Sequence, residues 1–221
     1  MRRITLESLV MSKPVLYGFP QSTYVRTVRL ALAEKGVDYD LVPTGFSSSG
    51  LKELHPFKRI PAFEHTPLTI FETTAICRYI DDAFEGPALS PGDAAGRALM
   101  EQWISVINNY LDPPAIRVIV IERITRPLQN QDTDEAKCLV AKPMVDHAFA
   151  VLDDALDDRN FIAGNAISLA DFFLLPILFY LRQLPEGMEL LPRRKNLEDW
   201  YSRMETRQSY AVTEPPAPGA R

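Results

Sequence analysis

The sequence changes character near residue 86, and this change limits the folds that the chain can adopt. Up to that point, short β-prone runs alternate with helical patterns. After Glu85-Gly86-Pro87 no convincing strand pattern occurs, and helical spacing continues to about residue 208. Mixed strands and helices pack as a sheet covered by helices, whereas helices alone must pack against one another. We therefore expect an α/β domain followed by an all-α domain.

The first part indicates a strand, a helix and a strand, followed later by a hairpin and a helix. Residues 14–19 are a short β-prone run, and the apolar stripe that follows ends at Gly36. A second strand is expected over 37–43, a hairpin over 61–71 and a helix over 72–84. After a loosely patterned stretch, the order βαβ then ββα predicts a mixed sheet with helices on its faces.

Two features stand out in the helical part. Ser168-Leu169-Ala170-Asp171 is a capping box, in which the serine hydroxyl caps the helix and the Asp171 carboxylate reaches back to the backbone. Aspartate is one carbon shorter than the usual glutamate, which makes that second bond harder to form. Pro113-Pro114 interrupts a long helical stretch between Arg97 and Arg123 and is expected to kink or break it.

Composition excludes several classes of function. The net charge of -5 is spread along the chain, so the basic stripe of a nucleic-acid binder is missing. Cys77 and Cys138 lie far apart without a Cys/His cluster, which argues against disulfides and against a metal site. The longest apolar runs are shorter than the roughly 20 residues that cross a bilayer, and residues 1–13 lack the apolar core of a signal peptide. We expect a cytoplasmic protein without nucleic-acid or membrane partners.

Four segments, in their order and spacing, resemble cytosolic glutathione S-transferases of the serine-dependent theta, phi and bacterial-like type. The segments are Leu16-Tyr17-Gly18-Phe19-Pro20-x-Ser22-x-x-Val25-Arg26 with Val28 to Gly36, His55-Pro56-Phe57-x-x-Ile60-Pro61-Ala62-Phe63, Phe71-Glu72-Thr73-x-Ala75-Ile76-x-x-Tyr79-Ile80, and Ser168-Leu169-Ala170-Asp171. In that family a thioredoxin-like domain of order βαβ-α-ββα precedes an all-α helical domain. The resemblance implies the same fold here.

The resemblance also implies a division of the chain and its ligands. Residues 1–13 would be an N-terminal extension, 14–85 a thioredoxin-like glutathione-binding domain, 86–93 a linker, and 94–221 an all-helical domain with an electrophile pocket. Glutathione would be a co-substrate, no metal would be required, and the protein would be a homodimer. The tail from Glu214, rich in Pro, Ala and Gly, is expected to be a loose end.

Ser22 is the residue that the resemblance places beside the glutathione thiol as its activator. Without the resemblance, a serine between a strand and a helix is an ordinary N-cap. Other classes use a tyrosine at the end of the first strand, but Gly18 holds that position here, and Tyr17 should point away into the core. Tyr24 is a reserve hydroxyl. Cysteine-dependent thiol exchange is disfavoured because Ser22 stands where that chemistry needs a cysteine.

The same resemblance assigns glutathione-binding roles to the following hairpin and helix. Pro61 would follow a cis peptide bond, leaving the main chain of Ile60 to pair with the cysteinyl part of the ligand. Glu72 and Thr73 begin a helix, where unpaired N–H groups and the helix dipole favour an anion. Thr73 would take the γ-glutamyl carboxylate and Glu72 the ammonium. The alternative is that both residues only complete the helix terminus.

The chain departs from the family at the glycyl end of the ligand. Relatives often carry a basic pair in the stretch matching residues 46–50, which contains no basic residue here. Arg59 and Lys52 are the candidates to replace that pair, although both residue types are usually solvated. The candidates for the electrophile pocket are Tyr24, Trp103, Ile107, Tyr110 and Arg117. The helical spacing of Trp103, Ile107 and Tyr110 is more typical of core positions than of a pocket.

The sequence thus predicts an enzyme that adds the glutathione thiolate to hydrophobic electrophiles. A glutathione-dependent isomerase, dehalogenase or peroxidase would use the same site. A binding or assembly module without catalysis is the non-enzymatic alternative, because a fold does not dictate a function.

Overall fold

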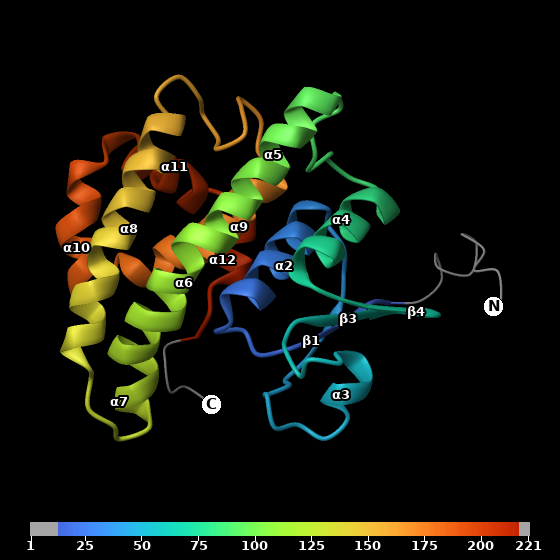
Figure 1. The fold of residues 1–221 in the computed structure, drawn as a ribbon. Helices are drawn as coiled ribbons and strands as arrows, with labels where there is room; N and C mark the ends of the chain where they lie inside the picture. The colour runs from blue at the N-terminus through green and yellow to red at the C-terminus, as the bar shows by residue number, and fades with distance from the viewer. Residues whose placement is uncertain (1–12, 217–221) are drawn as a thin grey trace. The chain divides into compact units, whose positions relative to one another are not determined.

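The computed structural model describes residues 13–216 (Figure 1). They form two compact units, one of residues up to Pro87 together with Ala211–Pro216, the other of Ala88–Tyr210. The N-terminal extension expected over 1–13 lies outside the described residues except for Lys13. The tail expected to be loose from Glu214 is described only as far as Pro216.

The first unit is built on a four-stranded mixed sheet of order β2-β1-β3-β4. The strands are β1 (Val15–Tyr17), β2 (Asp40–Val42), β3 (Ala62–His65) and β4 (Leu68–Phe71). β1 pairs parallel with β2 and antiparallel with β3, and β3 pairs antiparallel with β4. The sheet predicted from the strand patterns is confirmed.

Helices cover both faces of this sheet. They are α2 (Thr23–Glu34), α3 (Leu51–Leu54) and α4 (Thr73–Ala83). α2 and α4 lie side by side on one face, and α3 lies on the other (Figure 1). Val25, Val28 and Leu32, which form the predicted apolar stripe of α2, are fully buried. Gly36 takes a φ of +68°, which lets the chain turn away where the helix ends.

A buried ion pair ties α2 to α4. Lys35 Nζ lies 3.3 Å from Asp81 Oδ1, and their side chains are only 3% and 6% exposed. The same ammonium donates to the carbonyl of Pro87 at 3.2 Å. A Cβ atom on Gly86 would lie 2.9 Å from the carbonyl oxygen of Lys35, so only glycine fits there. These contacts fix where the chain leaves the first unit.

The chain returns to the first unit through α12 (Gln208–Thr213). The guanidinium of Arg29, on α2, donates to the carbonyls of Thr213 at 3.0 Å and Val212 at 3.1 Å. It also donates to the hydroxyl of Tyr39 at 3.1 Å. Thr213 is 1% exposed. This segment is therefore part of the packed structure of the first unit.

The second unit is helical throughout, apart from an isolated bridge between Phe161 and Gly164. Its elements are α5 (Ala94–Val106), η1 (Ile107–Leu111), α6 (Asp112–Pro114), η2 (Ala115–Thr125), α7 (Arg126–Leu128), α8 (Glu135–Ala155), α9 (Leu169–Leu181), α10 (Pro185–Leu190), η3 (Leu191–Arg193) and α11 (Lys195–Glu205). In α9 every residue except Phe179 is buried, so this helix forms the centre of the unit. The all-α prediction is confirmed.

The helical path continues through Pro113-Pro114, where the sequence predicts a kink or a break. The two prolines lie in α6, between the π-helical segments η1 and η2. Proline lacks the N–H that a helix would use, and here the hydrogen-bond spacing changes around it while the chain stays helical. π-helical geometry is rare and is usually confined to single turns.

The predicted capping box at the start of α9 is confirmed, including its reciprocal bond. Asp171 Oδ2 accepts from the backbone N–H of Ser168 at 2.8 Å. The other carboxylate oxygen, Oδ1, accepts from Ile162 N at 3.0 Å and from the indole Nε1 of Trp200 at 2.8 Å. One buried carboxylate thus joins α9 to the preceding loop and to α11.

Candidate functional site

The register of the sheet brings three candidate segments to one end of the first unit. Ala62 is paired both with Tyr17 and with Phe71. Three segments therefore meet at the same end of the sheet. They are the residues after Tyr17, the residues after Phe71 and the peptide before Ala62. A Cβ atom on Gly18 would lie 3.6 Å from Cβ of Ile60, which confirms that the end of β1 lies against the loop before β3.

Ser22 occupies the N-cap of α2. Its Oγ accepts from the backbone N–H of Val25 at 3.4 Å, a long bond near the limit for such contacts. A serine hydroxyl has one proton to donate, and no group among the described residues accepts it. Ser22 is half-buried. The hydroxyl therefore caps the helix as an acceptor, and its own proton has no acceptor among the described residues.

The hydroxyl of Tyr17 is already engaged. It donates to Glu64 Oε2 at 2.8 Å. Desolvation and this bond to a carboxylate raise the pKa of Tyr17. Tyr17 is half-buried, so its predicted position in the core is wrong. Tyr24, the reserve hydroxyl, is half-buried in the first turn of α2.

The peptide bond between Ile60 and Pro61 is cis, as the resemblance implies. The side chain of Ile60 is buried, with 7% of the residue exposed. No described residue forms a hydrogen bond with the main-chain N–H or C=O of Ile60. An extended ligand can pair with these groups in the manner of an added strand.

Glu72 has the most unusual backbone at this end of the sheet. Its φ is +72° and its ψ is 118°, and it is the N-cap of α4 without capping the helix through its side chain. Positive φ is rare for residues other than glycine, and it is concentrated at functional sites, where the surrounding structure stabilises it. The observed strain marks Glu72 as a candidate functional residue.

The start of α4 offers several donors to an anion. The first helical N–H with a backbone partner is that of Ile76, which donates to the carbonyl of Glu72 at 3.0 Å. No described residue accepts from the N–H groups of residues 73–75, or pairs with the hydroxyl of Thr73. Thr73 is only 6% exposed. A carboxylate at this position would gain both the N–H groups and the helix dipole.

His55 is a neighbour of Glu72 that sequence reasoning did not assign to the site. It is 2% exposed, and its ring packs on Phe71 with centroids 4.7 Å apart. Its Nε2 lies 3.9 Å from Glu72 Oε1. Burial lowers the pKa of His55; the charge of Glu72 opposes this shift and that of Arg59 adds to it. No spacing pattern in the sequence signals this contact.

The candidates for the glycyl end of the ligand are all exposed. Lys52 lies on α3, and Arg59 immediately precedes Ile60. Between them, Lys58 adopts a φ of +51° and adds a third exposed cation, which the sequence had not singled out. In the stretch without basic residues, Ser48 Oγ accepts from the N–H of Gly45 at 2.9 Å.

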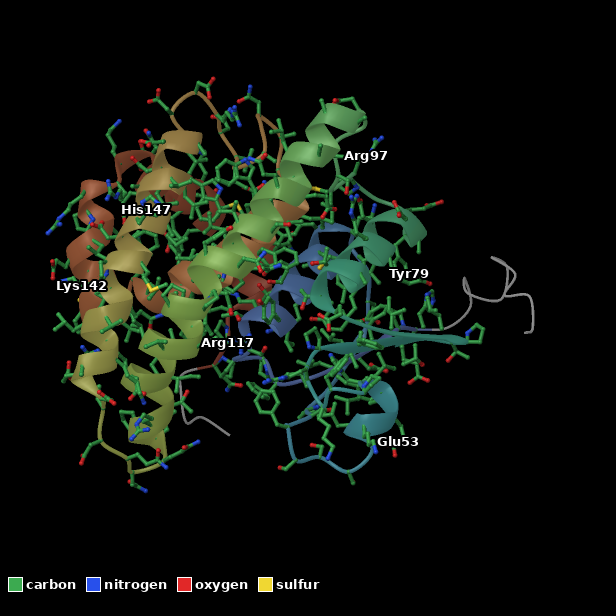
Figure 2. The ribbon with its side chains drawn as sticks, in the orientation of Figure 1. Glu53, Tyr79, Arg97, Arg117, Lys142 and His147 are labelled. Atoms are coloured by element: carbon green, nitrogen blue, oxygen red, sulfur yellow. The ribbon has the colours of Figure 1, made fainter. Side chains whose placement is uncertain are left out.

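The pocket candidates of the second unit fall into two groups. Trp103 and Ile107 are buried, at 7% and 0% exposure, as core residues would be. Tyr110 is 67% exposed. Arg117 projects from η2 (Figure 2), and its Nε donates to Asp112 Oδ1 at 2.9 Å. Trp103 and Ile107 therefore belong to the core of the second unit, whereas Tyr110 and Arg117 lie at its surface.

The cysteine thiols are poor nucleophiles. Both Cys77 and Cys138 are buried and unpaired by disulfides. Burial raises the pKa of each thiol, so the reactive thiolate is suppressed. Among residues 13–216 no group of His, Cys, Asp and Glu side chains could hold a metal ion, and no helix is long and apolar enough to span a membrane.

Comparisons with known proteins agree with this geometry. Residues 13–82 match the model of the glutathione S-transferase N-terminal domain, and residues 124–203 match that of the C-terminal domain. The chain is 30% identical over 219 residues to glutathione S-transferase 3 of Zea mays, covering 93% of this chain and 97% of the relative. The chain belongs to the glutathione S-transferase family. It is therefore a transferase with a thioredoxin-like domain and an all-α domain.

Further relatives of this transferase come from other plants. Glutathione S-transferase F14 of Arabidopsis thaliana is 30% identical over 190 residues, covering 81% of this chain and 74% of the relative. The crystal structure of glutathione transferase F7 from Populus trichocarpa superposes with a TM-score of 0.84 at 26% identity, covering 90% of this chain and 97% of that one. The fold of the transferase is thus that of solved family members.

Proposed function

We propose that this transferase conjugates the thiolate of glutathione to hydrophobic electrophiles, and that the end of the sheet in the first unit binds the tripeptide. The observation that carries this proposal is the start of α4. There, strained Glu72 and buried Thr73 stand at an uncapped helix N-terminus. A purely structural helix start gains no stability from this strain, whereas a ligand site can use it.

The γ-glutamyl end of glutathione carries a carboxylate and an ammonium. The N–H groups of residues 73–75 and the Thr73 hydroxyl suit the carboxylate, since charge-assisted hydrogen bonds at a helix N-terminus are strong. The carboxylate of Glu72, which does not cap its own helix, suits the ammonium. The main chain of Ile60 supplies the hydrogen bonds for the cysteinyl residue, next to cis Pro61.

Ser22 is the proposed activator of the thiol. The pKa of a free thiol is about 8.5, and lowering it by two units requires roughly 2.7 kcal/mol of preferential thiolate stabilisation. A hydroxyl bond to the charged sulfur contributes about 1.5–3 kcal/mol, and the N-terminus of α2 adds about 0.3–1 kcal/mol. Because Ser22 Oγ accepts from Val25 N–H at 3.4 Å, its proton stays available for sulfur.

The glycyl carboxylate and the electrophile have less specific determinants. Arg59 and Lys52 remain the proposed partners of the carboxylate; both are exposed, so each contributes little alone. For the electrophile pocket we propose the residues named from the sequence, which are Tyr24, Trp103, Ile107, Tyr110 and Arg117. Activity assays with aryl halides, peroxides and haloalkanes separate conjugation from the alternative reactions on the same scaffold.

We further propose that the transferase works as a cytoplasmic homodimer. Phe57, in the loop before Ile60, is 74% exposed, and it is our candidate contact because aromatic side chains are enriched at protein–protein interfaces. Analytical ultracentrifugation of the wild type and of Phe57→Ser tests the association. If both variants sediment as monomers, the homodimer proposal is wrong.

The central experiment compares Ser22→Ala with Ser22→Thr, which keeps the hydroxyl. We expect Ser22→Ala to lower the rate of conjugation to a chloronitrobenzene roughly ten- to hundredfold, the loss expected for one charge-assisted bond. The pH–rate profile of Ser22→Ala should shift towards the pKa of the free thiol, while calorimetry shows nearly unchanged glutathione binding. A profile that does not move in Ser22→Ala would reject Ser22 as the activator.

A further inference from the structure

The ring of His55 is held rigidly beside Glu72. His55 directly follows α3, and its backbone N–H donates to the carbonyl of Leu51 at 2.8 Å. Its side chain is 3% exposed, and it packs against Phe71, the residue that precedes Glu72. A ring packed in this way has little rotamer freedom. The direction of its two nitrogens is therefore fixed by the fold.

The hydrogen bond to Nδ1 of His55 determines which ring nitrogen carries the proton. Nδ1 lies 3.3 Å from the backbone N–H of Phe57, which can only donate. Nδ1 must then be the acceptor, and a neutral imidazole carries its single proton on the other nitrogen. That nitrogen, Nε2, lies 3.9 Å from Glu72 Oε1. The ring thus presents an N–H dipole to the carboxylate.

The carboxylate of Glu72 has no other polar neighbour that would fix its direction. It does not cap α4, and the side chain is 66% exposed. Among the described residues, His55 is the only one with a polar contact to it. An exposed carboxylate without a partner samples several rotamers, and fixing one of them costs conformational free energy when a ligand binds.

We propose that His55 is a positioning residue, whose Nε2–H orients the Glu72 carboxylate towards the ammonium of the γ-glutamyl group. This inference rests on the proposed function of Glu72. It assigns His55 to the recognition of a ligand that carries an α-ammonium next to an α-carboxylate. His55 does not touch the ligand in this role; it reduces the conformational freedom that Glu72 loses on binding.

The neutral state of His55 matters for this role. A cation at the same position would neutralise Glu72 and compete with the ligand's ammonium, whereas a neutral N–H orients the carboxylate and leaves its charge. The charged groups that act on the ring are Glu72, at the start of α4, and Arg59, in the loop after α3. β4, which packs beside it, contributes no ionisable side chain. Desolvation and Arg59 both favour the neutral ring.

The test compares two ligands and two variants. His55→Phe keeps an aromatic ring but loses the N–H, whereas His55→Gln keeps an N–H at a similar distance from the backbone. The ligands are glutathione and glutaryl-cysteinyl-glycine, which has the same carboxylate but no ammonium. Calorimetry should show glutathione binding weakened roughly fivefold or more in His55→Phe and restored in His55→Gln, a coupling typical of neighbouring groups. Binding of the glutaryl peptide should be equal in all three proteins.

A matched control removes the other buried histidine of this unit. His65 is 3% exposed and bonds to the hydroxyl of Tyr79 at 2.8 Å, so His65→Phe reports the general cost of losing such a residue. If His55→Phe weakens both ligands equally, or has no more effect than His65→Phe, the proposal is wrong. Glu72→Gln separates the role proposed for Glu72 from the role proposed for His55. If Glu72→Gln weakens glutathione binding and His55→Phe does not, only the role of His55 is wrong.

Discussion

A side-chain carbon on Gly18 would lie 2.4 Å from Cγ2 of Val25, far closer than two carbon atoms approach in proteins. This contact places the first turn of α2 directly against the end of β1. It also explains why no larger residue can stand at the position where other transferases carry a tyrosine. Under the proposed function the activating hydroxyl comes from another residue, and Ser22 is joined to Val25 by its N-cap bond.

The first prediction concerns this contact. Gly18→Ala should destabilise the protein by about 1–3 kcal/mol, the usual cost of overpacking, as measured by urea unfolding. Gly92→Ala is the control, because nothing lies within 4 Å of a Cβ atom built at Gly92. Adding Val25→Ala to Gly18→Ala should recover part of the loss. Equal stabilities of the Gly18→Ala and Gly92→Ala variants would contradict the packing described.

The second prediction concerns the strained backbone of Glu72. Glycine accepts a φ of +72° without steric cost, so Glu72→Gly should raise the free energy of unfolding by on the order of 1 kcal/mol. Glu72→Ala keeps the strain and should bring no such gain. Both variants lose the carboxylate and should bind glutathione at least tenfold more weakly in calorimetry. A Glu72→Gly variant that is less stable than Glu72→Ala would show that the backbone is not strained.

The third prediction concerns the ion pair between α2 and α4. Asp81→Ala removes the carboxylate and leaves the Lys35 ammonium buried without its counter-ion. This change should lower the free energy of unfolding, measured in urea, by about 3–5 kcal/mol. Asp38→Ala is the control, since that carboxylate is 87% exposed in its pair with Lys13, and should cost less than about 1 kcal/mol. A loss in Asp81→Ala no larger than that of the control would show that the pair is not desolvated.

The fourth prediction concerns acid sensitivity. The backbone N–H of Asp134 and the ammonium of Lys137 hold the pKa of Glu122 below its ordinary value of 4.5. A carboxylate with a lowered pKa stabilises the folded state above its unfolded pKa and loses this effect as pH falls through its folded pKa. Unfolding free energies measured from pH 7 to pH 3 should therefore fall less steeply for Glu122→Gln than for the wild type. Identical slopes for Glu122→Gln and the wild type would refute this role.

The order of strands and helices in the first unit was predictable because local patterns coincide with burial. Val25, Val28 and Leu32 form an apolar stripe, and this is the side of the helix that is buried. The turn after this helix requires a positive φ, which Gly36 adopts without steric cost. The capping box of Ser168 and Asp171 is likewise a local pattern, and its bonds form as expected. The hydrogen bond from Trp200 to the Asp171 carboxylate joins residues far apart in sequence, so no local pattern predicts it.

The site was predictable only where a local pattern carries it. The start of α4 shows in the sequence as a polar pair before an apolar stripe, but the strain at Glu72 does not. The contact of His55 with Glu72 depends on how α3 packs against β4, and the engagement of Tyr17 by Glu64 depends on strand register. Pro113 and Pro114 predict a kink or a break by their own chemistry, but the chain stays helical through them because π-helical segments lie on either side.

The return of residues 211–216 to the first unit has a consequence for how the molecule is made. Arg29 emerges early from the ribosome, but the carbonyls of Val212 and Thr213 that its guanidinium binds are synthesised more than 180 residues later, as their sequence separations of 183 and 184 show. The unit that begins the chain is therefore completed after the helical unit has been synthesised. The contacts of Arg29 with Val212 and Thr213 can form only after residues 88–210 have been synthesised.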